Sequence, residues 1–359
     1  MIPFARSDSR SLSIMPSVHR VVAILLGTLA VAVSPAAAAP KRAAPEGYGT
    51  RADVRAFIDE MAVEHNYDRF ALQRALATVR FQPQVVAAMD RPLLEPPKWH
   101  DYALPFLARE RVDGGVAWWN AHASDLARAE ERYGVPGEVI VAIVGVETFY
   151  GRNTGKHRAL DALATLAFDY PRRAAFFRGE LKQFLLLARE QGVAPQAPKG
   201  SFAGALGVPQ FMPGSYRNFA VDFDGNGRID LWTSPADIVG SVANFLARHD
   251  WQPGQPVLLP AAIAPDNRDA VLRRLDGGIS ERRALDAWAA DGVTAMAEPP
   301  DLATDPVGLL LLEERAPGGE ESASYWIACQ NFYVLTRYNK SRLYAAAVWE
   351  LAKAIRDAR

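Results

Sequence analysis

Residues 138–147 (EVIVAIVGVE) form the segment that most constrains how this chain can fold. Apart from its two glutamates, the segment contains only apolar residues and one glycine. A helix built from it is apolar on nearly every side and has to lie inside a protein. Val135-Pro136-Gly137 supplies a start signal, and Gly151 with Asn153 supplies a stop signal. The sequence therefore predicts a buried central helix that ends at an ionisable acid, Glu147.

Apolar residues also recur at helical spacing on both sides of this segment, which predicts a mainly α protein. Helices are expected from residue 53, after Pro171, from the Ser234-Pro235 start signal to about His249, and over 341–356. Between 251 and 330 short apolar runs (VLLP, VGLLLLEE and SYWIAC) alternate with Pro, Gly and acidic turns. This change predicts a small α/β subdomain inserted into the helical domain.

The N-terminus has the layout of a secretory signal peptide. The uncharged run at 21–33 (VVAILLGTLAVAV) follows Arg10, His19 and Arg20 and precedes SPAAAAP at 34–40. We expect residues 1–38 to be the signal peptide, cleaved after Ala38, with 39–50 as a flexible lead-in. An N-terminal membrane anchor is the alternative, which the shortness of the run disfavours. No cysteine follows the run, so we expect no attached lipid there.

Charge and cysteine content narrow the function classes. Removing residues 1–38 takes away three arginines and one aspartate, which changes the net charge from −1 to −3. No basic block stands out, so nucleic acid is not an expected partner. Cys329 is the only cysteine and cannot form an intrachain disulfide. We expect a buried, inert thiol, since the six histidines show no spacing typical of a catalytic metal or a Cys–His pair.

Glu147 is the candidate catalytic residue. Near the carboxyl end of a buried helix, both the helix dipole and the apolar neighbours disfavour its ionised form, so its pKa should rise. A carboxylic acid with a raised pKa can protonate a glycosidic oxygen near neutral pH. The alternative is a structural glutamate paired with Arg152 or Arg172. Spacing alone leaves both possibilities open.

Three long strings bear on that choice: IVAIVGVETFYGRNTG, LDALATLAFDYPRRAAFFRGEL and GSFAGALGVPQFMPGSY. In this order they closely resemble the membrane-bound lytic murein transglycosylase B family, and the similarity runs from about residue 51 to the C-terminus. The resemblance implies a lysozyme-like catalytic domain over 51–250, with a return to it at 331–359 after the insert. It also implies that Glu147 is the acid/base. Because the N-terminus has the layout of a signal peptide without a cysteine for lipid attachment, we expect a periplasmic, soluble exported form of this family.

By resemblance, the reaction is cleavage of the β-1,4 bond between N-acetylmuramic acid and N-acetylglucosamine in peptidoglycan, with 1,6-anhydromuramoyl ends as product. One carboxylate suffices if the sugar's own acetamido group stabilises the cationic centre and its 6-hydroxyl attacks. A muramidase-type hydrolase that uses water, and a non-catalytic murein-binding scaffold, are the alternatives. Glycan strands are the expected partners, and cell-wall synthesis or division proteins remain open.

The family pattern also marks substrate-contacting positions. The residues themselves suit the role: glycines let a backbone approach a sugar, amides and hydroxyls bind acetamido groups, aromatic rings stack on sugars, and arginines bind carboxylates. A plain connecting loop and merely solvated arginines are the alternatives. The positions are Tyr102, Arg172, Arg173, Ser201, Gln210, Tyr338 and Asn339. Of the nearby acids, Asp161 and Asp169 resemble caps or turn residues, and Glu180 remains open.

Residues 222–233 (DFDGNGRIDLWT) resemble an EF-hand calcium loop. The expected ligands are Asp222, Asp224, Asn226, the carbonyl of Arg228, and Asp230. Thr233 stands where a bidentate acid is usual, and no regular helix is expected before the loop, because Pro213 and Gly214 interrupt MPGSYRNF. We expect weak structural calcium and no cofactor for catalysis, with a metal-free turn as the alternative.

Overall fold

The computed structural model describes residues 47–91, 97–297, 306–316 and 318–359. The expected signal peptide at 1–38 and most of the lead-in at 39–50 lie outside these residues. Across the described ranges, no helix is both long enough and apolar enough to cross a membrane.

Helices dominate the described chain, and the predicted mainly α class is confirmed. The α-helices are α1 (Ala52–His65), α2 (Arg69–Ala77), α3 (Pro83–Met89), α4 (Trp99–Leu107), α5 (Arg109–Ala121), α6 (Ala123–Tyr133), α7 (Gly137–Thr148), α8 (Ala159–Asp169), α9 (Ala174–Glu190), α10 (Pro213–Phe219), α11 (Pro235–Ala247), α12 (Arg268–Leu272), α13 (Leu285–Ala290), α14 (Gln330–Tyr338) and α15 (Arg342–Ala358). Two 3-10 turns, η1 (Pro171–Arg173) and η2 (Pro265–Asn267), precede α9 and α12.

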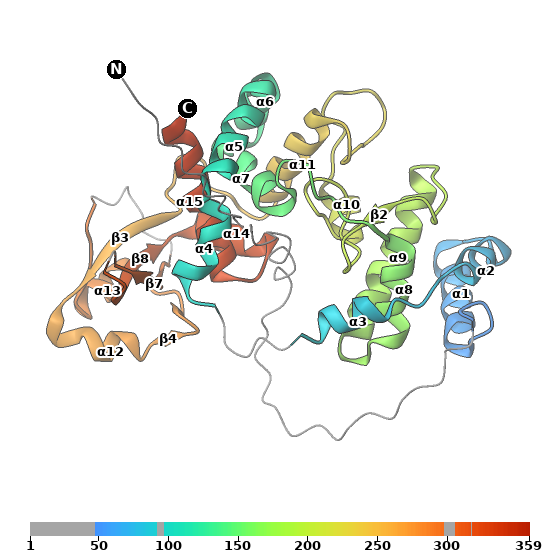
Figure 1. The fold of residues 1–359 in the computed structure, drawn as a ribbon, viewed down its shortest axis with the longest axis horizontal. Helices are drawn as coiled ribbons and strands as arrows, with labels where there is room; N and C mark the ends of the chain where they lie inside the picture. Colours follow the sequence, from blue (N-terminus) through green and yellow to red (C-terminus); the bar gives the residue numbers. More distant parts are fainter. Residues whose placement is uncertain (1–46, 92–96, 298–305, 317) are drawn as a thin grey trace, which may run out of the picture.

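These elements form three regions along the molecule (Figure 1). Helices α1, α2, α3, α8 and α9 lie at one end, the sheet lies at the other, and α4–α7, α11, α14 and α15 lie between them. The main hydrophobic core is continuous through both helical regions. The C-terminal helix α15 packs against α4, α5 and α7, so the end of the chain returns to the middle of the fold.

Helix α7 is the buried central helix that the sequence predicts. Ten of its twelve residues are buried, including every residue from Val139 to Val146. Pro136 occupies the N-cap, and Phe149 ends the helix in the left-handed region at φ 52°. The next residue, Tyr150, also has a positive φ of 59°. Two consecutive bulky residues in this region are unusual and mark a sharply fixed turn directly after Glu147.

The predicted α/β region contains a six-stranded antiparallel sheet in the order β4-β5-β7-β8-β3-β6. Its strands are β3 (Leu258–Ile263), β4 (Leu275–Asp276), β5 (Ile279–Ser280), β6 (Val293–Ala295), β7 (Gly308–Arg315) and β8 (Glu321–Ala328). The three apolar runs of the sequence supply β3, β7 and β8. A separate small core surrounds Trp288 and contains the buried Cys329. Burial raises the pKa of the Cys329 thiol to about 12, in keeping with the inert cysteine that we expect.

A short ribbon of β1 (His157–Arg158) and β2 (Lys199–Gly200) joins the two helical regions. After it, the chain forms the loop 201–212 and then α10. The expectation that no regular helix precedes the calcium-like loop is wrong, because α10 covers Pro213–Phe219. Pro213 occupies the first helical position, where no N–H is needed, so it starts the helix instead of breaking it. The N–H of Gly214 is satisfied by Glu180 at 2.8 Å.

Candidate active site

The Glu147 side chain lies where α7 meets α15. Its Oε1 accepts a hydrogen bond of 2.6 Å from the hydroxyl of Tyr344, which is completely buried. Glu147 itself remains partly accessible, unlike the residues that precede it on α7. The carboxyl group is therefore held by one neutral donor at the edge of the core.

Burial raises the pKa of Glu147 from 4.5 to about 7. The hydrogen bond from Tyr344 favours the carboxylate and opposes part of that rise. Near neutral pH a substantial fraction of the molecules then carries a protonated Glu147. The raised pKa expected from the sequence is present, and desolvation is its main cause.

The alternative of a structural ion pair finds no support in the described residues. Arg152 pairs with Glu110 at 3.1 Å, and Arg172 pairs with Asp90 at 3.5 Å. A third guanidinium, Arg111, donates to the carbonyls of Pro105 and Gly145 and does not pair with Glu147. Glu147 thus lacks a cationic partner among the described residues and has the environment of a proton donor.

Two of the expected substrate-contacting tyrosines lie close to Glu147. Burial raises the pKa values of Tyr102 and Tyr338, and the nearby charge of Glu147 adds to both shifts. The ring of Tyr338 stacks parallel to Tyr344, with centroids 6.3 Å apart and an angle of 13° between the rings. Its hydroxyl donates to the carbonyl of Pro209 at 2.6 Å. Tyr344, the stacked Tyr338 and Tyr102 therefore give the acid an aromatic surrounding.

The turn after Glu147 is bonded to the loop 201–212. The buried Thr148 donates to the carbonyl of Val208 at 2.9 Å and accepts from the N–H of Gly151 at 3.1 Å. Gln210, at a positive φ of 52°, donates through Nε2 to the carbonyls of Thr154 and Gly207 at 3.1 and 2.8 Å. These contacts fix the position of the loop relative to the acid. The amide nitrogen of Gln210 is already engaged, so only its carbonyl oxygen remains to bind a sugar.

Ser201 shapes the start of the same loop. Its Oγ accepts from the N–H groups of Ala203 and Ala205 at 3.3 and 3.0 Å. The hydroxyl hydrogen is left to donate to a ligand. Gly155 lies against this segment so closely that a Cβ there would come within 2.1 Å of the Gly200 carbonyl. The glycines of this region permit close packing of backbone on backbone, which supports an ordered loop over a plain connection.

The three remaining expected positions are Arg172, Arg173 and Asn339, and each lies next to other groups of its own region. Arg173 covers the rings of Phe176 and Phe177, and the side chain of Arg172 is 73% exposed. Asn339 follows α14 as its C-cap and accepts the N–H of Ser341 through its carbonyl at 2.7 Å. The roles of these three residues at the site stay predictions.

The remaining acids are engaged elsewhere. Asp169 is the last residue of α8, where it pairs with Arg51 and accepts a hydrogen bond from Tyr48. Asp161 begins α8, where its carboxylate accepts the N–H of Arg80 at 3.3 Å. Glu180 accepts the N–H of Gly214, and burial raises its pKa. Each of the three acids therefore has a partner other than Glu147.

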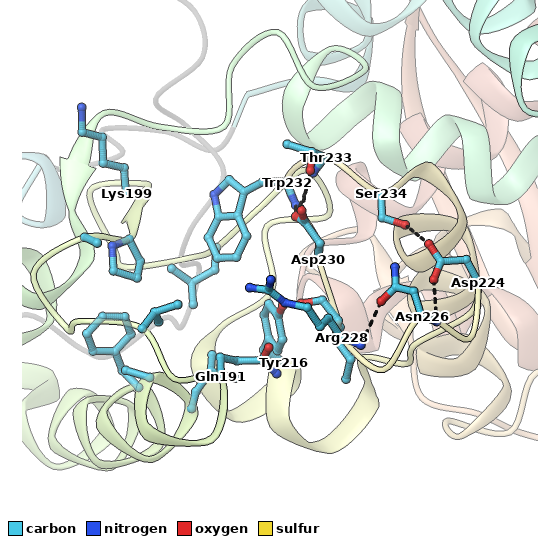
Figure 2. A pocket seen from close by; sticks show the side chains of 18 of the residues that line it. Gln191, Lys199, Tyr216, Asp224, Asn226, Arg228, Asp230, Trp232, Thr233 and Ser234 are labelled. Atoms are coloured by element: carbon cyan, nitrogen blue, oxygen red, sulfur yellow. Dashed lines mark hydrogen bonds between the residues drawn. The ribbon is translucent and has the colours of Figure 1, made fainter.

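Two adjoining cavities, which share Trp232, Thr233 and Pro235, border the loop 201–212. The larger has a volume of about 930 Å³ and lies between the second half of α9, strand β2 and residues 224–235 (Figure 2). The smaller, of about 340 Å³, borders the catalytic turn at Tyr150, Gly151 and Arg152. Glu147 lines neither, so both lie apart from the acid itself.

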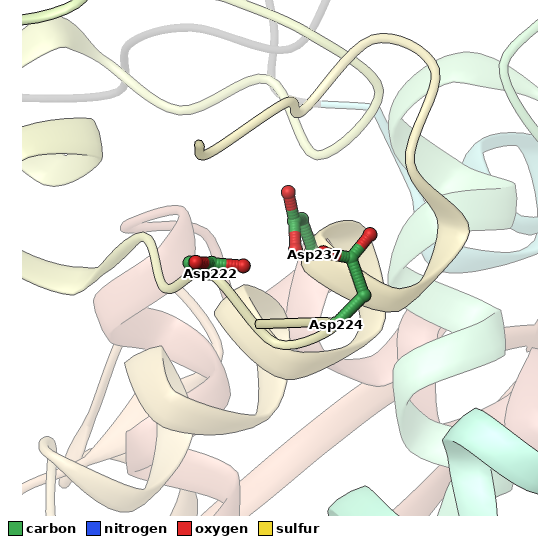
Figure 3. Close-up of side chains that lie close together, drawn as sticks. All are labelled: Asp222, Asp224 and Asp237. Carbon is green, nitrogen blue, oxygen red and sulfur yellow. The ribbon is translucent and has the colours of Figure 1, made fainter. Parts of the chain in front are cut away.

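The calcium-like loop has an ordered internal frame. Asp222 accepts the N–H groups of Gly225, Asn226 and Gly227, and Asn226 accepts that of Arg228. Asp222 and Asp224 each offer an oxygen to a common cluster whose ligand atoms lie within 4.8 Å of one another (Figure 3). Hard oxygen donors converging in this way suit Ca²⁺, so the residues present fit the ion.

The third carboxylate of this cluster is Asp237, which our reading of the sequence missed. It lies in the first turn of α11, buried, and accepts the N–H groups of Phe223 and Asp230 at 2.8 Å each. Asp230 instead binds the N–H groups of Trp232 and Thr233 and the hydroxyl of Thr233. Asp237 therefore supplies an acid near the place where Thr233 lacks one.

Comparison with known proteins identifies the family to which the chain with this site belongs. Residues 49–353 match the family described as transglycosylase SLT domain. The membrane-bound lytic murein transglycosylase B of Escherichia coli K12 is 41% identical over 322 residues, which cover 87% of this chain and 85% of that protein. Soluble lytic transglycosylase SltB1 from Pseudomonas aeruginosa superposes with a TM-score of 0.78 at 43% identity, covering 86% of this chain and 99% of SltB1. The Escherichia coli lytic transglycosylase Slt35, solved in complex with calcium, gives a TM-score of 0.76 at 41% identity, covering 86% of this chain and 94% of Slt35.

Proposed function

This chain belongs to the transglycosylase SLT domain family and is a peptidoglycan lytic transglycosylase, and from that premise we propose that Glu147 alone performs both of its proton transfers. The similarity to SltB1 and Slt35 also confirms the expected lysozyme-like fold class. The observation that carries the proposal is the environment of Glu147: no cation of the described chain pairs with it, the hydroxyl of Tyr344 donates a hydrogen bond to it, and its pKa is about 7.

In the first step, protonated Glu147 donates its proton to the oxygen of the β-1,4 bond between N-acetylmuramic acid and N-acetylglucosamine. The bond from the anomeric carbon to that oxygen breaks, and the N-acetylglucosamine side leaves as an alcohol. The carbonyl of the 2-acetamido group stabilises the cationic centre that remains. Glu147 is left as a carboxylate, and Tyr344 already points a hydroxyl at it, so the new charge is stabilised without rearrangement.

In the second step, the Glu147 carboxylate accepts the proton of the 6-hydroxyl of the same muramic acid. The 6-oxygen then bonds to the anomeric carbon and closes the 1,6-anhydro ring, and Glu147 regains its starting proton. The nucleophile is tethered to the reacting centre, which gives it a large advantage over free water. Tyr344 beside the acid is completely buried, so the carboxyl group of Glu147 is desolvated on that side.

The muramidase alternative needs a second acid to activate water. Asp161, Asp169 and Glu180 are bound to Arg80, Arg51 and Gly214 respectively, and this arrangement favours the one-carboxylate route. We assign sugar contacts to Ser201, to the carbonyl oxygen of Gln210, and to Tyr102 and Tyr338. The other proposed contacts are Arg172, Arg173 and Asn339.

The decisive experiment is muropeptide analysis of sacculi digested by the wild-type protein and by Glu147→Gln. We expect wild-type products with anhydro ends, one water lighter than reducing ends, and no soluble product from Glu147→Gln. Products with reducing ends would favour the muramidase. A Glu147→Gln protein that digests like wild type would leave the acid/base role of Glu147 without support and favour a non-catalytic scaffold.

We also propose that the loop 222–233 holds a structural calcium ion, as the printed description of Slt35 in complex with calcium suggests for that relative. Asp222, Asp224, Asn226, the Arg228 carbonyl and Asp230 would hold it, with Asp237 as an added carboxylate. The ion would tie the start of α11 to the loop and take no part in bond cleavage. With Thr233 in place of an acid, we expect binding in the weak range.

The cellular setting follows from the substrate. We propose that the protein works in the periplasm after export by a cleaved signal peptide, without a lipid anchor. Glycan strands of peptidoglycan are its substrate, and cell-wall synthesis or division proteins would guide it there. We retain the proposed division into a catalytic domain over 51–250, an inserted subdomain over 251–330 and a C-terminal return.

A further inference from the structure

We propose that the larger cavity is a second peptidoglycan site and that it binds a stem peptide, while the glycan strand occupies the region of Glu147. This inference rests on the proposed function, because the muramic acid residues of peptidoglycan carry short peptides. The cavity volume of about 930 Å³ is at the upper end of the range of about 300–1,000 Å³ that is typical of small-molecule sites. That volume suits a peptide of several residues in an extended form.

Apolar side chains line much of the cavity. Phe184 and Leu187 come from α9, and Val193 and Pro198 come from the segment after it. Trp232 comes from the loop before α11 (Figure 2). Apolar surface of this kind suits the methyl side chains of alanine residues, which stem peptides contain. Contact of these methyl groups with the indole and aliphatic surfaces would remove apolar area from water.

Two cations, Arg228 and Lys199, also line the cavity, without salt-bridge partners among the described residues. Arg228 extends toward the middle of the lining residues, and Lys199 lies at the edge (Figure 2). Within the described chain, neither side chain has a carboxylate within 4.0 Å, whereas Arg217, near the same end of α9, is paired with Glu190. Arg228 and Lys199 are both exposed, so an unpaired cation beside the cavity is accessible to a carboxylate from a ligand.

Charge complementarity favours a peptide over a sugar. N-acetylated sugars are neutral and would leave Arg228 and Lys199 without an anionic partner. A stem peptide has free carboxylates for these cations. The combination of unpaired cations with apolar surface therefore matches a peptide that carries carboxylates and methyl side chains.

The cavity is also placed to act together with the catalytic turn. It shares Trp232, Thr233 and Pro235 with the smaller cavity, which reaches Tyr150, Gly151 and Arg152. A peptide bound in the larger cavity would therefore lie next to the turn that follows Glu147. Such a site would anchor the enzyme to peptide-bearing murein without blocking the acid.

The direct test is calorimetric titration with a synthetic, sugar-free stem pentapeptide that contains the diamino acid. We expect one peptide per chain and a loss of about tenfold in affinity in Arg228→Gln and in Lys199→Glu, which is the effect of one charge-assisted hydrogen bond. Arg273→Glu is the matched control, because Arg273 is an exposed cation after α12 that does not line the cavity. Calcium is held constant, and circular dichroism checks folding.

Equal peptide affinity in the wild type and both cavity variants would overturn the inference, as would the absence of binding at millimolar peptide. If a tetramer of N-acetylglucosamine, and not the peptide, loses affinity in these variants, the cavity binds glycan and the inference is wrong. As a second readout, Lys199→Glu should lower the ratio of cleavage of peptide-bearing sacculi to cleavage of peptide-free glycan, relative to Arg273→Glu. Failure of the proposed function would show separately, as digestion by Glu147→Gln, and would leave the peptide titration unaffected.

Discussion

The hydroxyl of Tyr344 donates to the carboxylate of Glu147 at 2.6 Å, although the two residues are 197 positions apart in the sequence. This bond joins the end of α7 to the first turn of α15. Tyr344 is buried, so its hydroxyl has no water to bind and stays directed at the acid. The pair therefore connects the last helix of the chain to the proposed proton donor.

Tyr344→Phe removes the hydrogen bond and keeps the ring. Since the bond lowers the pKa of Glu147, its loss should raise that pKa above about 7. We expect the pH profile of kcat/KM to shift to higher pH, with a lower maximum because the carboxylate left after the first step loses its donor. A profile identical to that of the wild type would show that Tyr344 acts only in packing.

Glu147→Gln also predicts a change in how stability depends on pH. The acid titrates near 4.5 when unfolded and near 7 when folded, so the folded state binds the extra proton. Protonation of Glu147 therefore contributes about 3 kcal/mol to the free energy of unfolding of the wild type. This contribution is fully present below pH 4.5 and is lost as the pH rises through about 7. The melting temperature of Glu147→Gln, measured against that of the wild type, should therefore rise between pH 4.5 and 8.

Glu60→Gln provides a control of opposite sign. Arg178 and Lys182 lower the pKa of Glu60, so its contribution to stability is present above pH 4.5 and is lost as the pH falls through its folded-state pKa. The melting temperature of Glu60→Gln should be lower than that of the wild type at neutral pH, and the difference should shrink in acid. Parallel curves for Glu147→Gln and the wild type would contradict the burial of an unpaired acid.

The sequence predicts α7 and the acid at its end because ten consecutive positions leave that segment no exposed face. The helix start at Ser234-Pro235 and the apolar strands β7 and β8 are equally local signals, and the structure contains each of them. The resemblance to a family supplied what local patterns lack, namely the reaction.

Other features depend on contacts between distant residues. Tyr344 occupies an ordinary apolar position on an amphipathic helix, and only the packing of α15 against α7 shows that its hydroxyl meets Glu147. Asp237 lies beyond a twelve-residue calcium loop, so that template does not include it. From the sequence, Pro213 is expected to break a helix, but in the structure it occupies the first position of α10, where proline is tolerated. The order of strands in the sheet is likewise set by packing and not by any one segment.

Calcium should stabilise the protein if the loop 222–233 binds it. Binding to the folded state alone raises the melting temperature with concentration, by an amount set by the ratio of free calcium to the dissociation constant. We expect a rise at millimolar calcium that Asp222→Asn abolishes, because Asp222 both belongs to the carboxylate cluster and frames the loop. Asp276→Asn, which changes an exposed acid in β4, should retain the full rise. Calorimetry without heat of binding at millimolar calcium would exclude the site.

Thr148→Val tests whether the turn after Glu147 has to be held in place for catalysis. The change keeps the shape of the side chain but leaves the carbonyl of Val208 and the N–H of Gly151 unpaired, which should cost about 1–3 kcal/mol of stability. Thr165→Val is matched to it, since Thr165 is also buried in a helix and accepts the N–H of Gln82 at 3.1 Å.

Urea unfolding should show similar losses of stability in the two threonine variants. Only Thr148→Val should lower kcat, by about tenfold or more, because a small displacement of a catalytic group is enough to slow a reaction strongly. KM should change little if the glycan contacts lie on the loop and not on the turn. Equal kcat values in Thr148→Val and Thr165→Val would mean that the catalytic turn keeps its position without the bond to Val208, and that Tyr344 and the packing of α7 suffice to hold Glu147.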